Sequence, residues 1–224
     1  MTQSQWTAVE QYITGLLVPA DPALEAALAA AAAAGLPAIS VSPNEGKLLH
    51  LIARIRGARH ILEIGTLAGY STIWLARALA PGGRLITLEF DPKHAAIARV
   101  NIAHAGLADV VDVRVGRALD TLPLIASEHP EPFDLVFIDA DKQSNADYFA
   151  WALNLTRRGS VIIVDNVIRN GAVIDAANGD ASIRGVRRFN EMLAAEPRVS
   201  ATEIQTVGSK GYDGFALAVV ISDA

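Results

Sequence analysis

The sequence predicts an α/β fold with a doubly wound, mostly parallel sheet of seven strands, helices on both faces and a C-terminal antiparallel hairpin. Three observations predict it. From residue 60 onward, short β-branched runs alternate with segments of helix length, which is typical of βαβ units. The runs at 135–138 and 161–164 are continuously apolar, as in strands covered on both faces. The last two runs are joined only by the turn-rich stretch 208–214, which is too short for a parallel crossover.

Three helices are expected before the first strand. The second and third each begin with an oxygen-bearing cap residue followed by proline, a pattern that favours the first helical turn. Ser42 and Glu45 also have the spacing of a capping box. The expected ranges of these helices are 5–17, 21–35 and 42–56.

The alternating region follows these helices. Strands are expected at 60–64, 84–89, 111–115, 133–139, 159–165, 199–207 and 214–221. Helices are expected at 70–80, 92–105, 117–128, 145–157 and 180–195. Because no linker, repeat or low-complexity segment interrupts the chain, we expect one domain over residues 1–224, with the N-terminal helices (about 1–57) preceding the α/β core.

Composition restricts the classes of partner and chemistry. A chain of 224 residues with 51% apolar composition can bury a full core. Its net charge of −5 argues against nucleic acid and anionic membranes as partners, because both require a basic surface. The absence of cysteine excludes disulfides, thiolate catalysis and Cys-ligated zinc. Neither a signal peptide nor an apolar run of ~20 residues is evident, so a cytoplasmic protein is expected.

Two of the apolar runs end abruptly in polar side chains. Asp139 follows the run at 135–138, and Asp165 and Asn166 follow the run at 161–164. If these strands are neighbours, their ends lie about 4.8 Å apart. Three hard oxygen donors at one point predict a site for a divalent cation, Mg²⁺ first, with Mn²⁺ or Ca²⁺ as alternatives.

A second candidate site is the glycine turn after the first expected strand, where Gly65 and Gly69 precede a helix start. A dinucleotide loop would need a third, central glycine, and Glu63 would repel a pyrophosphate. S-adenosylmethionine carries a sulfonium and an ammonium, so an acidic turn suits it better. Glu89 at the end of the second strand lies near the offset at which a carboxylate binds ribose hydroxyls. An NAD-dependent oxidoreductase remains the alternative, with a non-catalytic cofactor-binding protein as a third class.

Taken together, five motifs resemble the cation-dependent O-methyltransferases, the family of catechol and caffeoyl-CoA O-methyltransferases and their bacterial relatives. The likeness extends from about Ser40 to the C-terminus. The motifs are SPNEG at 42–46, LEIGTLAGYS at 62–71, LEFD at 88–91, FIDADK at 137–142 and DNV at 165–167. The resemblance implies a Rossmann-like methyltransferase fold and methyl transfer from S-adenosylmethionine to a catechol-like or caffeoyl-type acceptor, a small aromatic diol.

The resemblance also implies roles for individual residues. Asp139, Asp165 and Asn166 match the metal ligands, and Lys142 matches the general base. Asn170 matches a substrate contact, and Arg169 replaces an aromatic residue of the plant members, which predicts a more polar or cationic acceptor pocket. The positions that match cofactor contacts are Val41, Glu63, Gly65, Thr66, Ser71, Glu89, Ala118 and Asp141.

The first expected helix, residues 5–17, carries more apolar surface than one domain edge needs. Homodimerisation is the expected use of this surface, in line with the family that the chain resembles.

Overall fold

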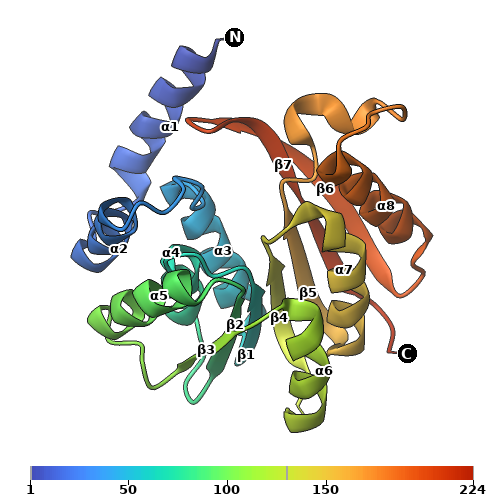
Figure 1. The fold of residues 1–224 in the computed structure, drawn as a ribbon, viewed down its shortest axis with the longest axis horizontal. Coiled ribbons are helices and arrows are strands. Elements are labelled where there is room, and N and C mark those ends of the chain that lie inside the picture. The colour runs from blue at the N-terminus through green and yellow to red at the C-terminus, as the bar shows by residue number, and fades with distance from the viewer. Residues whose placement is uncertain (1, 130, 224) are drawn as a thin grey trace.

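The computed structural model describes residues 2–129 and 131–223 and is built around a seven-stranded sheet (Figure 1). The strand order is β3-β2-β1-β4-β5-β7-β6. The elements in chain order are α1 (Gln3–Leu17), α2 (Pro22–Ala33), α3 (Pro43–Arg56), β1 (His60–Ile64), α4 (Tyr70–Ala76), β2 (Arg84–Glu89), α5 (Pro92–His104), β3 (Val111–Val115), α6 (Ala118–Glu128), β4 (Phe133–Ile138), the 3₁₀ turn η1 (Lys142–Ser144), α7 (Asn145–Asn154), β5 (Thr156–Asp165), the 3₁₀ segment η2 (Arg169–Ile174), α8 (Ala181–Ala195), β6 (Val199–Gly208) and β7 (Gly211–Val220).

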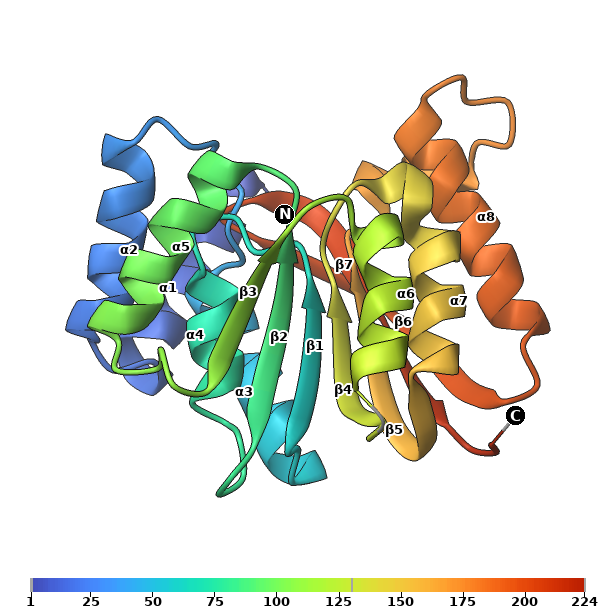
Figure 2. The same ribbon diagram turned by 60° about the horizontal axis from the view of Figure 1, so that its bottom comes forward.

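The predicted fold class is confirmed. β1 to β5 pair in parallel, and β7 pairs antiparallel with both β5 and β6. Figure 2 shows α2 to α5 on one side of the sheet and α6 to α8 on the other. The predicted caps are also present, since Ser42 and Glu45 make both hydrogen bonds of a capping box at the start of α3.

Four predicted boundaries are wrong by three residues or more. The helix expected at 70–80 ends at Ala76, because the chain then turns so that the Ala80 amide can bond to the Ala58 carbonyl. The fifth strand begins at Thr156, which pairs with Phe133 across a register shift, and this earlier start shortens the preceding helix. The hairpin turn is shorter than expected, because β6 and β7 remain paired up to Gly208 and Gly211.

The central strands are buried on both faces, which explains their unbroken apolar runs. Leu62 of β1 packs in one core cluster with Phe149 of α7 and Phe189 of α8. Its neighbour Ile61 packs in the opposite cluster with Ile73 of α4. This alternation directs Glu63, in the same strand, toward α4.

The strand order reverses between β1 and β4, which are neighbours in the sheet. Their carboxyl ends are tied together, because the Asp139 amide donates to the Ile64 carbonyl over 2.8 Å. Ligands of doubly wound sheets bind beyond the strand ends at such a point. Within the described residues, no helix is long and apolar enough to span a bilayer.

Candidate functional site

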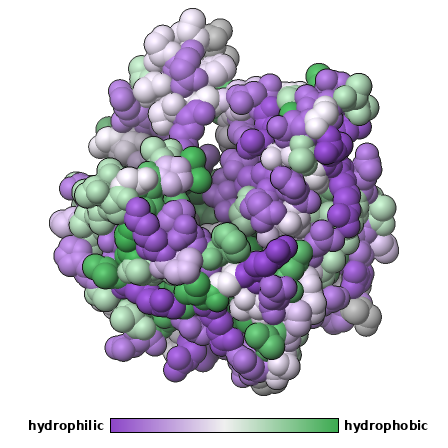
Figure 3. All heavy atoms as spheres, viewed as in Figure 1, coloured by the Kyte–Doolittle hydropathy of each residue, from purple (hydrophilic) through white to green (hydrophobic). Residues whose placement is uncertain are grey.

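A cavity of about 750 Å³ opens at the carboxyl ends of the central strands. The face of the molecule drawn in Figure 3 is hollowed near its centre, and hydrophilic residues border much of the hollow. Most of the residues singled out from the sequence line this cavity. They are Val41, Gly65, Thr66, Ser71, Glu89, Ala118, Asp139, Asp141, Lys142, Asn166 and Arg169.

Three of the predicted site residues are not part of this lining. Glu63 is fully buried beneath it. Asp165 lines a narrow adjoining cleft together with Glu45 and Phe215. Asn170 is exposed on the segment after β5, in a left-handed conformation with φ of 55°.

The loop after β1 is held against the ends of its neighbouring strands. Gly65 has φ of +103°, and a Cβ atom there would overlap the carbonyl oxygen of Asp139. Only glycine allows this approach. On the other side, the Glu89 carboxylate accepts hydrogen bonds from the Thr66 and Leu67 amides at 3.3 and 2.7 Å. The loop therefore presents its backbone to the cavity in a defined position.

Glu63 supports this loop from below. Its carboxylate accepts hydrogen bonds from the hydroxyls of Ser71 and Thr87, both at 2.7 Å, and from Thr72. Ser71 and Thr72 lie in the first turn of α4, so Glu63 links that turn to β2. Burial raises the pKa of Glu63 to about 7, against the stabilising effect of its hydroxyl partners.

This shift predicts a pH-dependent stability. Between pH 4.5 and about 7 the folded protein holds a proton at Glu63 that the unfolded chain has released, so the free energy of unfolding falls as pH rises through this window. Across this window the free energy of unfolding is expected to fall by about 3 kcal/mol. Glu63→Gln should flatten this part of the profile, as measured by urea unfolding at pH 5 and pH 8. Equal slopes in the two proteins would contradict the assignment.

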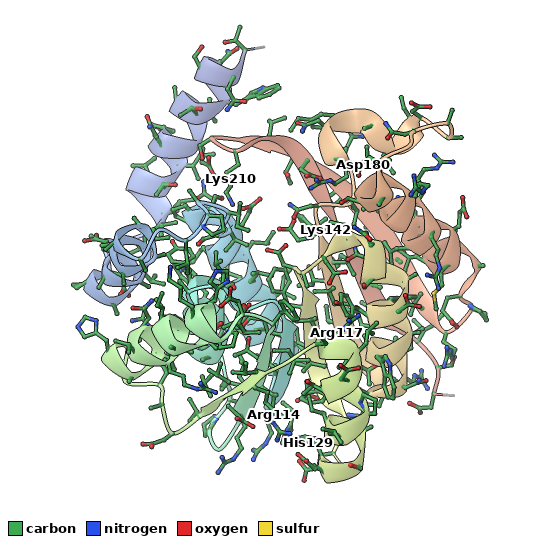
Figure 4. The ribbon with its side chains drawn as sticks, in the orientation of Figure 1. Arg114, Arg117, His129, Lys142, Asp180 and Lys210 are labelled. Atoms are coloured by element: carbon green, nitrogen blue, oxygen red, sulfur yellow. The ribbon has the colours of Figure 1, made fainter. Side chains whose placement is uncertain are left out.

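The acidic strand ends lie side by side, as expected. Asp139 and Asp165 directly follow Ile138 and Val164, which are paired across β4 and β5. Lys142 contacts Asp139, with Nζ 2.7 Å from Oδ1, and it lies near the centre of the view in Figure 4. Asn166 has φ of 58°, and its backbone amide donates to Oδ1 of Asp165 over 2.8 Å.

The electrostatics of the pair suit a cation. Desolvation and then the Asp139 carboxylate raise the pKa of Asp165, so a second negative charge is costly here. A divalent cation would reverse this repulsion, and two carboxylates with an amide oxygen match the hard ligands that Mg²⁺ prefers. Among the described residues, no group of three or more His, Cys, Asp or Glu side chains could hold a metal ion. The predicted ligand set is not such a group, because it contains only two carboxylates and its third member is an asparagine.

Several cavity residues were not expected from the sequence. Tyr148 donates its hydroxyl to Asp141, and its pKa is raised by burial and by that carboxylate. Tyr70, His94 and Arg117 line the cavity as well. Arg117 directly precedes Ala118, and Tyr70 precedes Ser71, so adjacency to predicted contacts was an available signal. His94 offered no such signal, because it comes from α5 beyond the LEFD motif.

Comparison with known proteins identifies the family. A family model described as O-methyltransferase matches residues 20–219. The chain belongs to the O-methyltransferase family. Two catechol O-methyltransferases resemble it closely. The one from Niastella koreensis is 54% identical over 98% of this chain and 100% of its own, and the one from Mycobacterium tuberculosis is 57% identical over 95% and 94%.

Solved O-methyltransferase structures share the whole fold. The Bacillus cereus enzyme, in complex with S-adenosylhomocysteine, is 61% identical, has a TM-score of 0.97 and is matched over 98% of this chain and 100% of its own. The Streptomyces achromogenes enzyme of tomaymycin synthesis, in complex with S-adenosylmethionine, is 53% identical, with a TM-score of 0.96 and coverage of 99% and 100%. The prediction of an O-methyltransferase is confirmed, against both the oxidoreductase and the non-catalytic alternatives.

Proposed function

We propose that this O-methyltransferase transfers the methyl group of S-adenosylmethionine to one hydroxyl of a small aromatic diol. The proposed reaction requires a divalent cation, for which Mg²⁺ is the first candidate. The observation that carries the proposal is the convergence of three strand ends. The glycine loop after β1, Asp139 after β4 and Asp165 at the end of β5 lie at the edge of the sheet where the strand order reverses. The proposed donor site and the proposed cation site would thereby be adjacent.

The methyl donor is supported by the cavity and by the relatives. Two relatives above 50% identity have been solved with S-adenosylmethionine or its demethylated product. In this chain, Gly65 and Thr66 of the loop and Ser71 in the first turn of α4 line the cavity, where they would contact a bound donor. The Glu89 and Asp141 carboxylates line the same cavity and suit a cationic donor.

The diol acceptor is supported by the names of the relatives at 54% and 57% identity, both catechol O-methyltransferases.

Asp139, Asp165 and Asn166 would hold the cation. When bound, the cation would supply Lewis-acid chemistry that lowers the pKa of an acceptor hydroxyl. Lys142, which is buried and lies beside Asp139, would take the hydroxyl proton when its amine is neutral. The fixed loop and strand ends would orient both reactants, which is a large part of the rate advantage of such transfers.

A methyl-transfer assay tests the proposal. The purified protein is incubated with methyl-labelled S-adenosylmethionine, Mg²⁺ and either catechol or phenol, and the labelled ether is measured by mass spectrometry. We expect a monomethyl ether from catechol and little product from phenol, which lacks the second hydroxyl. Equal turnover of the two acceptors, or tighter binding of NAD than of S-adenosylmethionine, would contradict the proposal.

We further propose a homodimer. α1 has no buried residue, and its Tyr12, Leu16 and Leu17 side chains are about two-thirds exposed, at 69%, 65% and 65%. Exposed apolar patches of this kind mark interaction surfaces. Sedimentation should give a dimer for the wild type and a shift toward monomer for the double variant Leu16→Glu, Leu17→Glu. A monomeric wild type at micromolar concentration would refute the dimer.

A further inference from the structure

Arg169 lines the cavity in the segment that follows Asn166, and its guanidinium is weakly engaged. The side chain is 36% exposed, and its nearest carboxylate oxygen, Oδ2 of Asp213, is 3.8 Å away, beyond hydrogen-bond distance. Within residues 2–129 and 131–223, the guanidinium makes no hydrogen bond. A residue that lines the cavity therefore carries a charged group whose five donors make no hydrogen bond within the described residues.

The carboxylates around Arg169 accept hydrogen bonds from backbone amides, and Oδ2 of Asp213 remains as the ion-pair partner of the guanidinium at 3.8 Å. Oδ1 of Asp213 accepts three backbone amides, from Ile168, Arg169 and Gly214, at 3.0, 2.9 and 3.0 Å. Asp180, labelled in Figure 4 at the start of α8, accepts the amides of Ser182 and Ile183. Asp213 thus holds the loop through Oδ1 and forms a long ion pair with the guanidinium through Oδ2, and Asp180 caps the helix; neither carboxylate accepts a hydrogen bond from the guanidinium.

The carboxylates that line the cavity also have their own donors. Asp139 is paired with Lys142, and Asp141 accepts the hydroxyls of Ser144 and Tyr148. Glu89 accepts backbone amides of the glycine loop. None of these carboxylates accepts a hydrogen bond from the guanidinium, so its donors can bind a ligand in addition to the long ion pair with Asp213.

The backbone at Arg169 is unfavourable for an arginine. Its φ is 55°, in the left-handed region that costs a side chain with a Cβ about 1 kcal/mol or more. Glycine would relieve this cost. Strained non-glycine residues of this kind cluster at ligand sites, where the side chain is used.

We infer that Arg169 binds a carboxylate substituent of the methyl acceptor, so that acidic catechols are preferred over neutral ones. The inference rests on the proposed function and names the acceptor class of the same site. The planar guanidinium can bind a carboxylate through two parallel hydrogen bonds. Arg169 follows the proposed ligand Asn166 by three residues, so a carboxylate held there belongs to the acceptor and not to the donor, which lies at the glycine loop.

The test compares acceptors that differ only in charge, 3,4-dihydroxybenzoate and its methyl ester. For the wild type, kcat/KM should be higher for the acid. Arg169→Gly, which suits the left-handed backbone, should lower kcat/KM for the acid by roughly tenfold to a hundredfold, the value of a charge-assisted pair. It should leave the ester unchanged within about twofold. Arg169→Lys should restore part of the preference, because the charge remains.

Arg184→Gln serves as the matched control. Arg184 lies near the start of α8, and its guanidinium donates to the Gly179 carbonyl, outside the cavity lining. We expect it to leave the acid-to-ester ratio unchanged. If Arg169→Gly lowers turnover of acid and ester equally, the residue only shapes the loop and the inference is overturned, while the proposed function stands. If the wild type methylates neither acceptor, the proposed function itself fails.

Discussion

Replacing Asp139 with asparagine is expected to lower methyl transfer to a catechol by roughly a thousandfold or more, since Lewis-acid assistance is worth several kcal/mol. Asp139 is one of only two carboxylates in the proposed ligand set, and it also pairs with Lys142. The variant therefore weakens cation binding and disturbs the proposed base together. Removal of divalent cations from the wild type with a chelator should cause a similar loss, and added Mg²⁺ should restore activity.

Two measurements separate this loss from misfolding. S-adenosylmethionine binding by calorimetry should change little, because the contact between Gly65 and the Asp139 main chain does not depend on the carboxylate. Asp120→Asn is the matched control, because that carboxylate is 77% exposed on α6. Its activity should equal that of the wild type. Full turnover by the Asp139 variant in the presence of chelator would exclude the proposed metal role.

Gly65→Ala is expected to have the largest structural effect of any single methyl addition near the site. The new Cβ would overlap the Asp139 carbonyl oxygen and lie 2.7 Å from its carbonyl carbon, in backbone that cannot rotate away. Its φ of +103° adds strain for any residue with a Cβ. We expect a loss of more than about 3 kcal/mol in the free energy of unfolding, since overpacking and strain act together. S-adenosylmethionine binding should be lost with the loop geometry.

Gly57→Ala separates the two causes. Gly57 ends α3 with φ of +65°, and a Cβ there would meet no atom within 4 Å. Only the backbone cost applies, so the expected loss is about 1 kcal/mol. Urea unfolding of both variants measures the difference. Comparable losses would mean that the close approach between the β1 loop and the end of β4 is not what requires glycine at position 65.

The order of helices and strands was predictable because it depends on local signals. Caps such as Ser42 with Glu45, and apolar runs such as 161–164, act within a few residues. Boundaries were less predictable where a tertiary contact decides them. Thr156 extends β5 because it pairs with Phe133 of β4, and no feature of the sequence within residues 154–158 predicts that pairing.

The sequence by itself determined the fold class, the acidic strand ends and the family, because periodicity and motif spacing are properties of the chain alone. Only the tertiary structure decided what each polar group faces. Glu63 and Asp141 are both carboxylates that match cofactor contacts, yet β1 directs Glu63 beneath α4 while Asp141 lines the cavity. The resemblance predicts that Arg169 lies near the acceptor, but the sequence does not show that Asp213, far along the chain on β7, lies 3.8 Å from its guanidinium without a hydrogen bond to it. Such choices depend on which strands pack together, and a linear pattern does not carry that information.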